Sequence, residues 1–293
     1  MKLGITGNTR KEGLWDSLLE LISFLNSSDH DYVLHPSIYQ GLKERAQSMD
    51  DIAAADSVAD FHDKADILLS LGGDGTLLNT VAELGEKQKP IIGVNHGRLG
   101  FLSSVERNEL KHRLKHLRSG EFEVEKRLIL QAELSSERRL PQPWAMNEFT
   151  IQRSGDAGLL AIEVRVNDDY LNTYWADGIV ISTPTGSTAY SLALGGPIMT
   201  PGCGSILITP IAPHTLTARP IVIPDHSSIH LKVVEPKKPH IFTSDGFSEK
   251  ETLVSDSVTI RKAQHVVNLI RFPGQDYFTT LRTKLMWGAR KEN

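Results

Sequence analysis

Leu71-Gly72-Gly73-Asp74-Gly75-Thr76 is the stretch that decides the fold. The apolar run Ile67–Leu71 that ends in it predicts a buried strand. Residues 77–84 behind it have apolar side chains at helical spacing, and Thr76 is placed to cap that helix. Three glycines and an aspartate therefore stand where a strand turns into a helix. Backbone N–H groups at such a turn point at an anion, and the missing side chains let a phosphate approach the main chain.

The aspartate of this turn needs its own explanation, because a carboxylate repels phosphate. A role for Asp74 as the base for a hydroxyl, or a contact with a metal-bound phosphate, would explain it. The alternative is an ordinary glycine-rich turn in which Asp74 is a local cap. The turn by itself leaves both interpretations open.

Length, charge and cysteine content exclude several classes of protein. A chain of 293 residues can hold two medium domains, and its net charge of −4 argues against nucleic acid as the main partner. The single cysteine, Cys203, excludes a disulfide framework and a cysteine-based zinc site. The sequence turns polar soon after Met1, unlike a signal peptide, and no apolar stretch has the length of a membrane span. We therefore expect a cytoplasmic protein without a membrane partner.

The first part of the chain alternates predicted strands with predicted helices. Such alternation is typical of a doubly wound parallel α/β sheet. A buried strand at residues 90–95 ends in a second glycine-rich loop at 95–102. Ligands of these sheets bind at the carboxyl ends of the strands, where both glycine-rich loops are expected.

The character of the sequence changes at Ser119-Gly120. Short apolar runs between turn residues then predict a series of strands without long helices, which indicates an all-β, sandwich-like or barrel-like domain. A closing helix is expected at Tyr277–Leu285. The predicted domains are an α/β nucleotide-binding domain, residues 1–119 with the C-terminal segment 275–293, and an all-β domain, residues 120–274. The expected strands of the second domain are 128–134, 149–152, 162–166, 179–182, 206–209, 221–223, 229–233 and 258–260.

Two stretches of the second domain have side chains suited to a nucleoside. Asn147-Glu148 offers an amide and a carboxylate that could bind a ribose diol, although a surface turn is the alternative. The hydroxyl-rich loop 182–191 is expected to open a helix at Ser187, with Tyr190 free to stack on a base. The turn Ser244-Asp245-Gly246 is uninformative by itself. No P-loop, no G-x-G-x-x-G after a strand and no nucleophile elbow is found.

Together these stretches resemble the NAD kinase family, the enzymes that phosphorylate NAD to NADP. The turn at residues 72–76 is also shared with lipid kinases and phosphofructokinase-like proteins. The long motif 177–190, followed by 213–220, is specific to NAD kinases. The resemblance covers residues 1–288 and is carried by 72–76, 95–102, 147–148, 177–190, 213–220 and 281–285.

The resemblance implies an α/β domain followed by a β-sandwich-like domain, with NAD in the cleft and subunits associated as homodimers or homotetramers. Asp74 corresponds to the family's general base on the 2′-hydroxyl of the adenosine ribose. Asp177 and Ala212 match positions that contact the nicotinamide half, partly across a subunit interface. Mg²⁺ is expected to bind through the phosphates of ATP, without a metal site of protein ligands. The expected NAD contacts are Asp74, Gly75, Phe101, Asn147, Glu148, Asp177, Thr188, Ala189, Tyr190, Ser191 and Ala212, and the donor phosphates are expected at Gly72, Gly73, Gly75 and Thr76.

Three positions depart from the family pattern. Gly158 stands where several members have His or Arg, Trp175 where many bacterial members have a basic residue, and Phe247 where Gln is common.

Two other hypotheses remain: a lipid or sugar kinase that is indifferent to NAD, and a non-catalytic NAD or NADP sensor. The 177–190 motif argues against the first, and the presence of Asp74 argues against the second.

Overall fold

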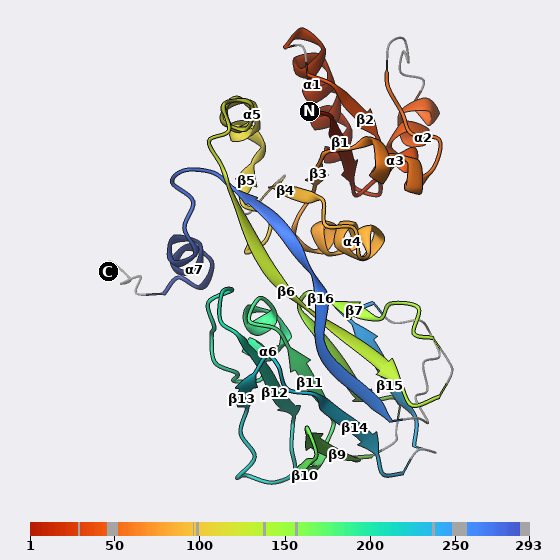
Figure 1. The fold of residues 1–293 in the computed structure, drawn as a ribbon, viewed down its shortest axis with the longest axis vertical. Helices are drawn as coiled ribbons and strands as arrows, with labels where there is room; N and C mark the ends of the chain where they lie inside the picture. The colour runs from red at the N-terminus through yellow and green to blue at the C-terminus, as the bar shows by residue number, and fades with distance from the viewer. Residues whose placement is uncertain are drawn as a thin grey trace. The chain divides into compact units, whose positions relative to one another are not determined.

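The computed structural model describes residues 1–28, 30–45, 52–95, 97, 100–136, 139–155, 158–235, 238–247 and 257–287. The chain divides into two compact units, Met1–Lys126 with Val267–Asn293, and Arg127–Val266 (Figure 1). Both boundaries fall inside long strands, β6 (Glu123–Leu134) and β16 (Val258–Arg271). The expected domain ranges, 1–119 with 275–293 and 120–274, stay a prediction.

The first unit is built on a parallel sheet. Strand β1 pairs in parallel with β2 and β3, β3 pairs with β4, and β4 pairs with β5 and with residues 268–269 of β16. The sequence produces this sheet because each buried apolar strand is followed by an amphipathic helix. The elements are β1 (Leu3–Gly7), α1 (Gly13–Ser27), β2 (Tyr32–Leu34), α2 (Pro36–Glu44), α3 (Val58–Lys64), β3 (Ile67–Leu71), α4 (Asp74–Leu84), β4 (Pro90–Asn95), β5 (Val105–Glu106), the 3₁₀ turn Arg107–Glu109, α5 (Leu110–Ser119) and α7 (Tyr277–Leu285).

Helices cover both faces of this sheet. On one face, Ile5 and Leu69 share a buried cluster with leucines of α1 and α5. On the other face, a Cβ at Gly4 would meet Phe61 of α3, and a Cβ at Gly93 would meet Leu77 of α4. The helices therefore pack directly on the strands, and the predicted doubly wound α/β class is confirmed.

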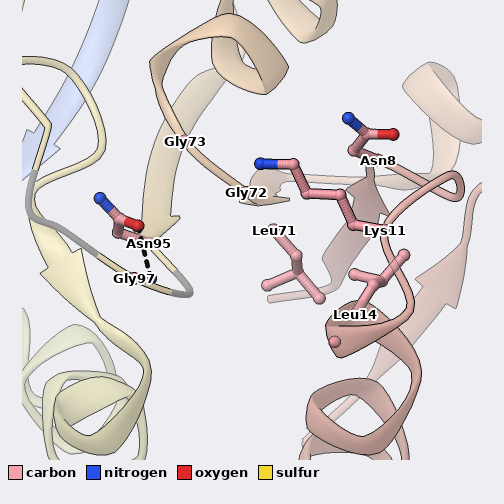
Figure 2. A pocket seen from close by; sticks show the side chains of 9 residues that line it. Asn8, Lys11, Leu14, Leu71, Gly72, Gly73, Asn95 and Gly97 are labelled. Atoms are coloured by element: carbon pink, nitrogen blue, oxygen red, sulfur yellow. Dashed lines mark hydrogen bonds between the residues drawn. The ribbon is translucent and has the colours of Figure 1, made fainter.

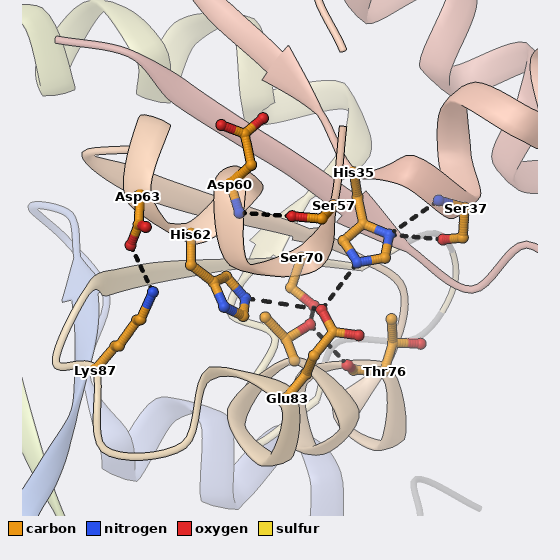
Figure 3. A network of polar contacts seen from close by, with 11 residues as sticks. His35, Ser37, Ser57, Asp60, His62, Asp63, Ser70, Thr76, Glu83 and Lys87 are labelled. Atoms are coloured by element: carbon orange, nitrogen blue, oxygen red, sulfur yellow. Dashed lines mark hydrogen bonds and ion pairs between the residues drawn. The ribbon is translucent and has the colours of Figure 1, made fainter. Parts of the chain in front are cut away.

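A polar network joins the helices on one side of the first unit (Figure 3). His35 precedes α2, and its Nδ1 accepts from the Ser37 N–H at 3.2 Å, so the ring proton lies on Nε2. That Nε2 lies 2.9 Å from Oε1 of Glu83 in α4, and Nε2 of His62 in α3 lies 3.7 Å from the same oxygen. Both histidine side chains are buried. One carboxylate thus contacts the imidazoles of two neighbouring segments.

The second unit contains two antiparallel sheets. One has the order β13-β12-β11-β8-β15, and the other runs β10-β9-β14-β16 and is extended by β6 and β7. Side chains of both sheets share one core, with Phe149 and Ile179 from the first and Ile162 and Leu231 from the second. The predicted sandwich-like domain is confirmed. Besides β6 and β16, its elements are β7 (Trp144–Ala145), β8 (Glu148–Arg153), β9 (Leu160–Val166), β10 (Asp169–Ala176), β11 (Gly178–Ser182), the 3₁₀ turn Gly186–Thr188, α6 (Tyr190–Ala193), β12 (Ser205–Ile211), β13 (Ile221–Pro224), β14 (Ile229–Val233) and β15 (His240–Ser244).

The helix expected to open at Ser187 is not observed. A 3₁₀ turn occupies Gly186–Thr188, and the α6 helix that follows has four residues. The Ser187 hydroxyl is buried, donates to the Pro184 carbonyl oxygen at 2.7 Å and accepts from the Met199 N–H at 3.0 Å, and no side chain caps the 3₁₀ turn or α6. The closing helix α7, in contrast, has the predicted bounds. Within the described residues, no helix is long and apolar enough to span a membrane.

Candidate active site

The turn between β3 and α4 leaves the first N–H groups of the helix without a side-chain cap. Helix α4 begins at Asp74 with Gly73 as its N-cap residue, and no side chain accepts a hydrogen bond there. The expectation that Thr76 caps this helix is therefore wrong. Thr76 lies within the first turn, buried beneath Gly72, where a Cβ would overlap its side chain. Uncapped N–H groups at a helix N-terminus are available to an anion.

The Asp74 carboxylate is bound to a distant loop of the same unit. Its Oδ2 accepts from the Phe101 N–H at 2.9 Å, and its Oδ1 accepts from the N–H groups of Leu102 and Ser103 at 3.1 and 2.9 Å. A Cβ at Gly100 would overlap the carboxylate, so glycine is required at that position. Asp74 is thus a tertiary anchor of residues 101–103 and not a local cap.

These contacts bring three of the expected NAD-contacting residues together. Asp74, Gly75 and Phe101 lie around the N-terminus of α4, and the Phe101 ring packs 6.5 Å from Tyr277 of α7, measured between centroids. Gly75 is exposed, and a Cβ there would meet open space. The surface beside the carboxylate is therefore open on the Gly75 side.

A cavity of about 390 Å³ lies at the carboxyl ends of β1, β3 and β4 (Figure 2). Its wall includes Gly72 and Gly73 but not Gly75 or Thr76, so it takes in half of the expected phosphate-binding set. Its volume falls in the range of small-molecule pockets. The remaining lining residues are Asn8, Lys11, Gly13, Leu14, Leu71, Asn95 and Gly97.

In the second unit, Asn147 and Glu148 lie against the hydroxyl-rich loop. The Asn147 carbonyl oxygen accepts from the Thr183 N–H at 2.9 Å and from the Ser182 hydroxyl at 3.2 Å. A Cβ at Gly186 would overlap the Asn147 carbonyl, so the loop can approach only with glycine at that position. Hydroxyl groups of this loop therefore form hydrogen bonds that hold the main chain in place, and not all of them are available to a ligand.

The expected contacts Thr188, Ala189, Tyr190 and Ser191 follow directly in the chain. Thr188 Oγ1 donates to the Thr185 carbonyl oxygen at 3.2 Å. Ser191 is buried, and its hydroxyl lies 3.0 Å from that of Thr209. Ala189 and Tyr190 are half-buried at the start of α6. A ligand could thus reach Tyr190 and Ala189, whereas the Ser191 hydroxyl is already engaged.

Asp245 is the residue of this site that the sequence did not reveal. Its Oδ1 accepts from the N–H groups of Asn147 and Glu148 at 2.7 and 2.9 Å, and its Oδ2 accepts from the Met146 N–H at 2.8 Å. The Asp245 N–H donates in turn to the Glu148 carbonyl oxygen at 2.9 Å. Burial raises the pKa of Asp245 to about 6, although the three N–H groups act to lower it. Asp245 fixes the backbone of the Asn147-Glu148 pair.

The environment of Glu148 favours its neutral acid. Burial, together with the negative charge of Asp245, raises the pKa of Glu148 to about 8, while the Tyr190 backbone N–H acts to lower it. Its Oε2 is buried and has no hydrogen-bond partner among the described residues. A protonated Glu148 can donate a hydrogen bond to a ligand, which an ionised carboxylate cannot.

Asp177 and Ala212 lie at the other end of the same strands. Glu148 is paired with Ser182 in the β8–β11 ladder, whereas Asp177 directly precedes Gly178 at the opposite end of β11. At about 3.3 Å per residue, this separates Asp177 from Ser182 by roughly 17 Å. The Asp177 N–H donates to the Ile211 carbonyl oxygen at 3.0 Å, next to Ala212. Within one copy of this unit, the two sets of expected NAD contacts are not brought together.

The three departures from the family pattern lie on the surface of the second unit. Trp175 is half exposed on β10, and Phe247 is 39% exposed after the Asp245 turn. Gly158 is exposed and has a φ of +66°, a backbone conformation that residues other than glycine rarely adopt.

Among the described residues, no group of three or more His, Cys, Asp or Glu side chains is arranged to hold a metal ion.

Comparison with known proteins gives one consistent result. The ATP-NAD kinase N-terminal domain matches residues 3–122, and the ATP-NAD kinase C-terminal domain matches residues 146–272. Relatives called NAD kinase include one from Flavobacterium johnsoniae, 36% identical with both chains fully covered, and one from Bacteroides fragilis, 37% identical over 99% of each chain. The crystal structure of yeast NADH kinase complexed with NADH has a TM-score of 0.89 and 25% identity, covering 99% of this chain and 89% of its own. An NAD kinase from Archaeoglobus fulgidus, at 22% identity and a TM-score of 0.76, shares the fold over 98% of this chain and 99% of its own. The resemblance inferred from the sequence is confirmed, and the chain belongs to the ATP-NAD kinase family.

Proposed function

We propose that this chain transfers the γ-phosphoryl group of ATP to the 2′-hydroxyl of the adenosine ribose of NAD, giving NADP. The observation that carries the proposal is the Asp74 carboxylate, fixed at the N-terminus of α4 by three N–H groups of residues 101–103. Membership of the family supplies the reaction class. The relatives named above are called NAD kinases, and this proposal extends their activity to the chain.

Asp74 would act as the general base. A carboxylate has about four lone-pair positions, and the three N–H groups occupy three of them, which leaves one for the 2′-hydroxyl proton. As that proton moves to Asp74, the ribose oxygen attacks the γ-phosphorus and the bond to the leaving ADP oxygen breaks in line. General-base catalysis contributes about 10²–10⁴-fold in rate.

The acceptor site would use both units. Gly75 and Phe101 would lie beside the ribose, with Asn147, Glu148, Thr188, Ala189, Tyr190 and Ser191 around the adenosine. Asp177 and Ala212 would contact the nicotinamide half of an NAD molecule bound mainly to another subunit. That other subunit would belong to a homodimer or homotetramer of this chain.

The donor phosphates would bind at Gly72, Gly73, Gly75 and Thr76. The uncapped N-terminus of α4 supports this assignment, because its N–H groups suit an anion. Mg²⁺ would arrive with the ATP phosphates and would neutralise the charge that develops during transfer. We also propose that the protein acts in the cytoplasm.

Product analysis tests the reaction. Purified protein is incubated with NAD and Mg-ATP, and the position of the new phosphate is read by ³¹P and ¹H nuclear magnetic resonance. We expect a 2′-phosphate on the adenosine ribose. Binding of NAD without turnover, with ATP or with polyphosphate, would instead favour the sensor hypothesis. Phosphorylation of a sugar or lipid alcohol with indifference to NAD would favour the other kinases that share the glycine-rich turn.

A further inference from the structure

Two histidines of α5 lie close enough to bind one metal ion together. His112 is exposed and His116 half-buried, and their spacing of four residues places them on one face of the helix, as in paired zinc ligands of helices. Their Nε2 atoms are 3.1 Å apart, and the rings meet edge to face with centroids 4.7 Å apart. Two nitrogens that bind one tetrahedral zinc ion at about 2.0–2.1 Å lie roughly 3.3 Å apart. The pair therefore has nearly the separation that a shared ion requires.

Glu121 holds His116 in the tautomer that can bind a metal ion. Nδ1 of His116 lies 2.6 Å from Oε2 of Glu121, and the ionised carboxylate only accepts, so the ring proton lies on Nδ1. The hydrogen bonds from His116 and Ser119 lower the pKa of Glu121, which keeps it ionised. Nε2 of neutral His116 then presents a lone pair. Histidine ligands of metal ions usually donate their other ring N–H to a carboxylate or a carbonyl in this way.

The end of α5 produces the contact between Glu121 and His116. Gly120 follows the helix with a φ of +75°, the left-handed conformation in which glycine commonly ends a helix. The Glu121 N–H then donates to the His116 carbonyl oxygen at 2.9 Å, so the chain folds back over the last turn. The three leucines of α5 are buried in the core of the first unit. The histidine pair therefore lies on a packed helix, which limits the reorganisation that binding costs.

The chemistry of the neighbouring side chains selects the kind of metal ion. Lys111 is paired with Glu20 at 2.7 Å and Arg113 with Glu109 at 3.1 Å, so both of these carboxylates already have a cation. Mg²⁺ and Ca²⁺ need oxygen ligands, which the two imidazoles do not offer. Zn²⁺, by contrast, binds neutral imidazole well. The pair thus suits a different ion from the Mg²⁺ expected with ATP.

We propose that His112 and His116 bind one Zn²⁺ ion through their Nε2 atoms, with Glu121 orienting His116 and water completing the coordination. With Nε2 of neutral His116 as acceptor, the His112 Nε2–H is the donor across the 3.1 Å contact. The ion takes the place of that proton, and neutral His112 then carries its proton on Nδ1. Because the ion joins two successive turns of α5, its binding stabilises this helix. The site is independent of the proposed function, since no step of that reaction uses these residues.

Isothermal titration calorimetry of ZnCl₂ into metal-free full-length protein, without ATP or NAD and at about pH 7.5, tests the proposal, because metal ions bind neutral imidazole. Removing the carboxylate partner of a histidine ligand typically costs 10–100-fold in metal affinity, so Glu121→Ala should weaken Zn²⁺ binding about tenfold or more. His112→Ala and His116→Ala should each weaken it at least as much, and alanine suits a helix. His226→Ala, at an exposed turn of the second unit, is the matched control and should bind Zn²⁺ like the wild type.

The pattern across the four variants decides between the outcomes. Loss of Zn²⁺ binding in both α5 histidine variants and in Glu121→Ala supports the site with its orienting carboxylate. Loss in both histidine variants but not in Glu121→Ala supports the pair and overturns the role of Glu121. Unchanged binding in either His112→Ala or His116→Ala, or an equal loss in His226→Ala, overturns the proposal. NADP formation in zinc-free buffer should be the same in all four variants, so a failure of the proposed reaction is seen separately.

Discussion

At the scale of single residues, Asp245 determines the geometry of the Asn147-Glu148 pair. Its carboxylate accepts hydrogen bonds from three main-chain N–H groups of residues 146–148. An asparagine at this position has one acceptor oxygen instead of two. Its NH₂ group would face a main-chain N–H donor and could not accept a hydrogen bond from it. Charge-assisted hydrogen bonds are worth about 1.5–3 kcal/mol each. We therefore expect Asp245→Asn to raise KM for NAD about tenfold or more and to change kcat little, as steady-state kinetics would show.

The pH dependence of kcat/KM for NAD separates a positioning role of Asp245 from a general loss of structure. In the wild type, kcat/KM should fall above about pH 8, because ionised Glu148 adds an unpaired buried charge beside Asp245. Asp245→Asn removes that neighbouring charge, so the fall should begin at a lower pH. Glu148→Gln, which stays neutral, should abolish it. Asp225→Asn is the control, because the native Asp225 carboxylate pairs with Lys262 and not with Glu148 or Asp245, and it should keep the wild-type profile. An unchanged alkaline fall in Glu148→Gln would contradict the assignment.

The residues that sequence alone revealed are those whose partners follow nearby in the chain. The glycine-rich turn and the 182–191 loop can be predicted from the sequence, because the signals for a strand, a turn and a helix follow one another directly in each of these stretches. Asp245 could not be found in this way, because its three acceptor contacts join residues 97–99 positions away in sequence. Asp74 was identified, but its contact with residues 101–103 was not, since no periodic pattern encodes it.

At the scale of elements, Glu83 holds three segments together through His35 and His62. Glu83→Ala should lower the free energy of unfolding by about 1–3 kcal/mol, because it leaves the buried His35 Nε2–H without an acceptor. Asn79→Ala, at an exposed position of the same helix α4, is the control and should change stability little. Urea denaturation of both variants measures the difference. Equal stability of Glu83→Ala and the wild type would show that the network is not stabilising.

The same network makes stability depend on pH. Burial lowers the pKa of His62 below 6.5, although the charge of Glu83 acts to raise it. Burial also acts to raise the pKa of Glu83, but its contacts with His35 and His62 outweigh this effect and leave it below 4.5. In both cases the unfolded chain binds more protons than the folded chain, so the free energy of unfolding should decline as pH falls through 6.5 and again through 4.5.

Elements with a clear period were predicted, and those defined by long-range pairing were not. Helix α7 and the strands β3 and β4 have strong local signals and lie where expected. Strand β10 was missed because most of its side chains are polar or exposed, and β15 because it is short and begins at a histidine. Strand β16 was expected at 258–260 only, yet it continues to Arg271 and reaches β4.

At the scale of the whole molecule, the proposed contact of Asp177 with an NAD molecule of another subunit predicts an active site that two subunits share. We expect light scattering to give a dimer or tetramer. Asp74→Asn and Asp177→Asn subunits, each with impaired turnover, should regain part of the wild-type rate after mixing under conditions of subunit exchange, since a mixed oligomer contains one intact site. Mixtures of either variant with itself are the control. A monomer in solution, or no recovery in a confirmed mixed oligomer, would contradict a shared site.

The most direct test of the central claim is single-turnover NADP formation by the wild type and by Asp74→Asn, with NAD affinity measured in the same samples. If Asp74 is the base, the variant should bind NAD within a few-fold of the wild type and form NADP about 10²–10⁴-fold more slowly. Near wild-type rates in Asp74→Asn would contradict the role of Asp74, and absence of NADP from the wild type would contradict the reaction itself.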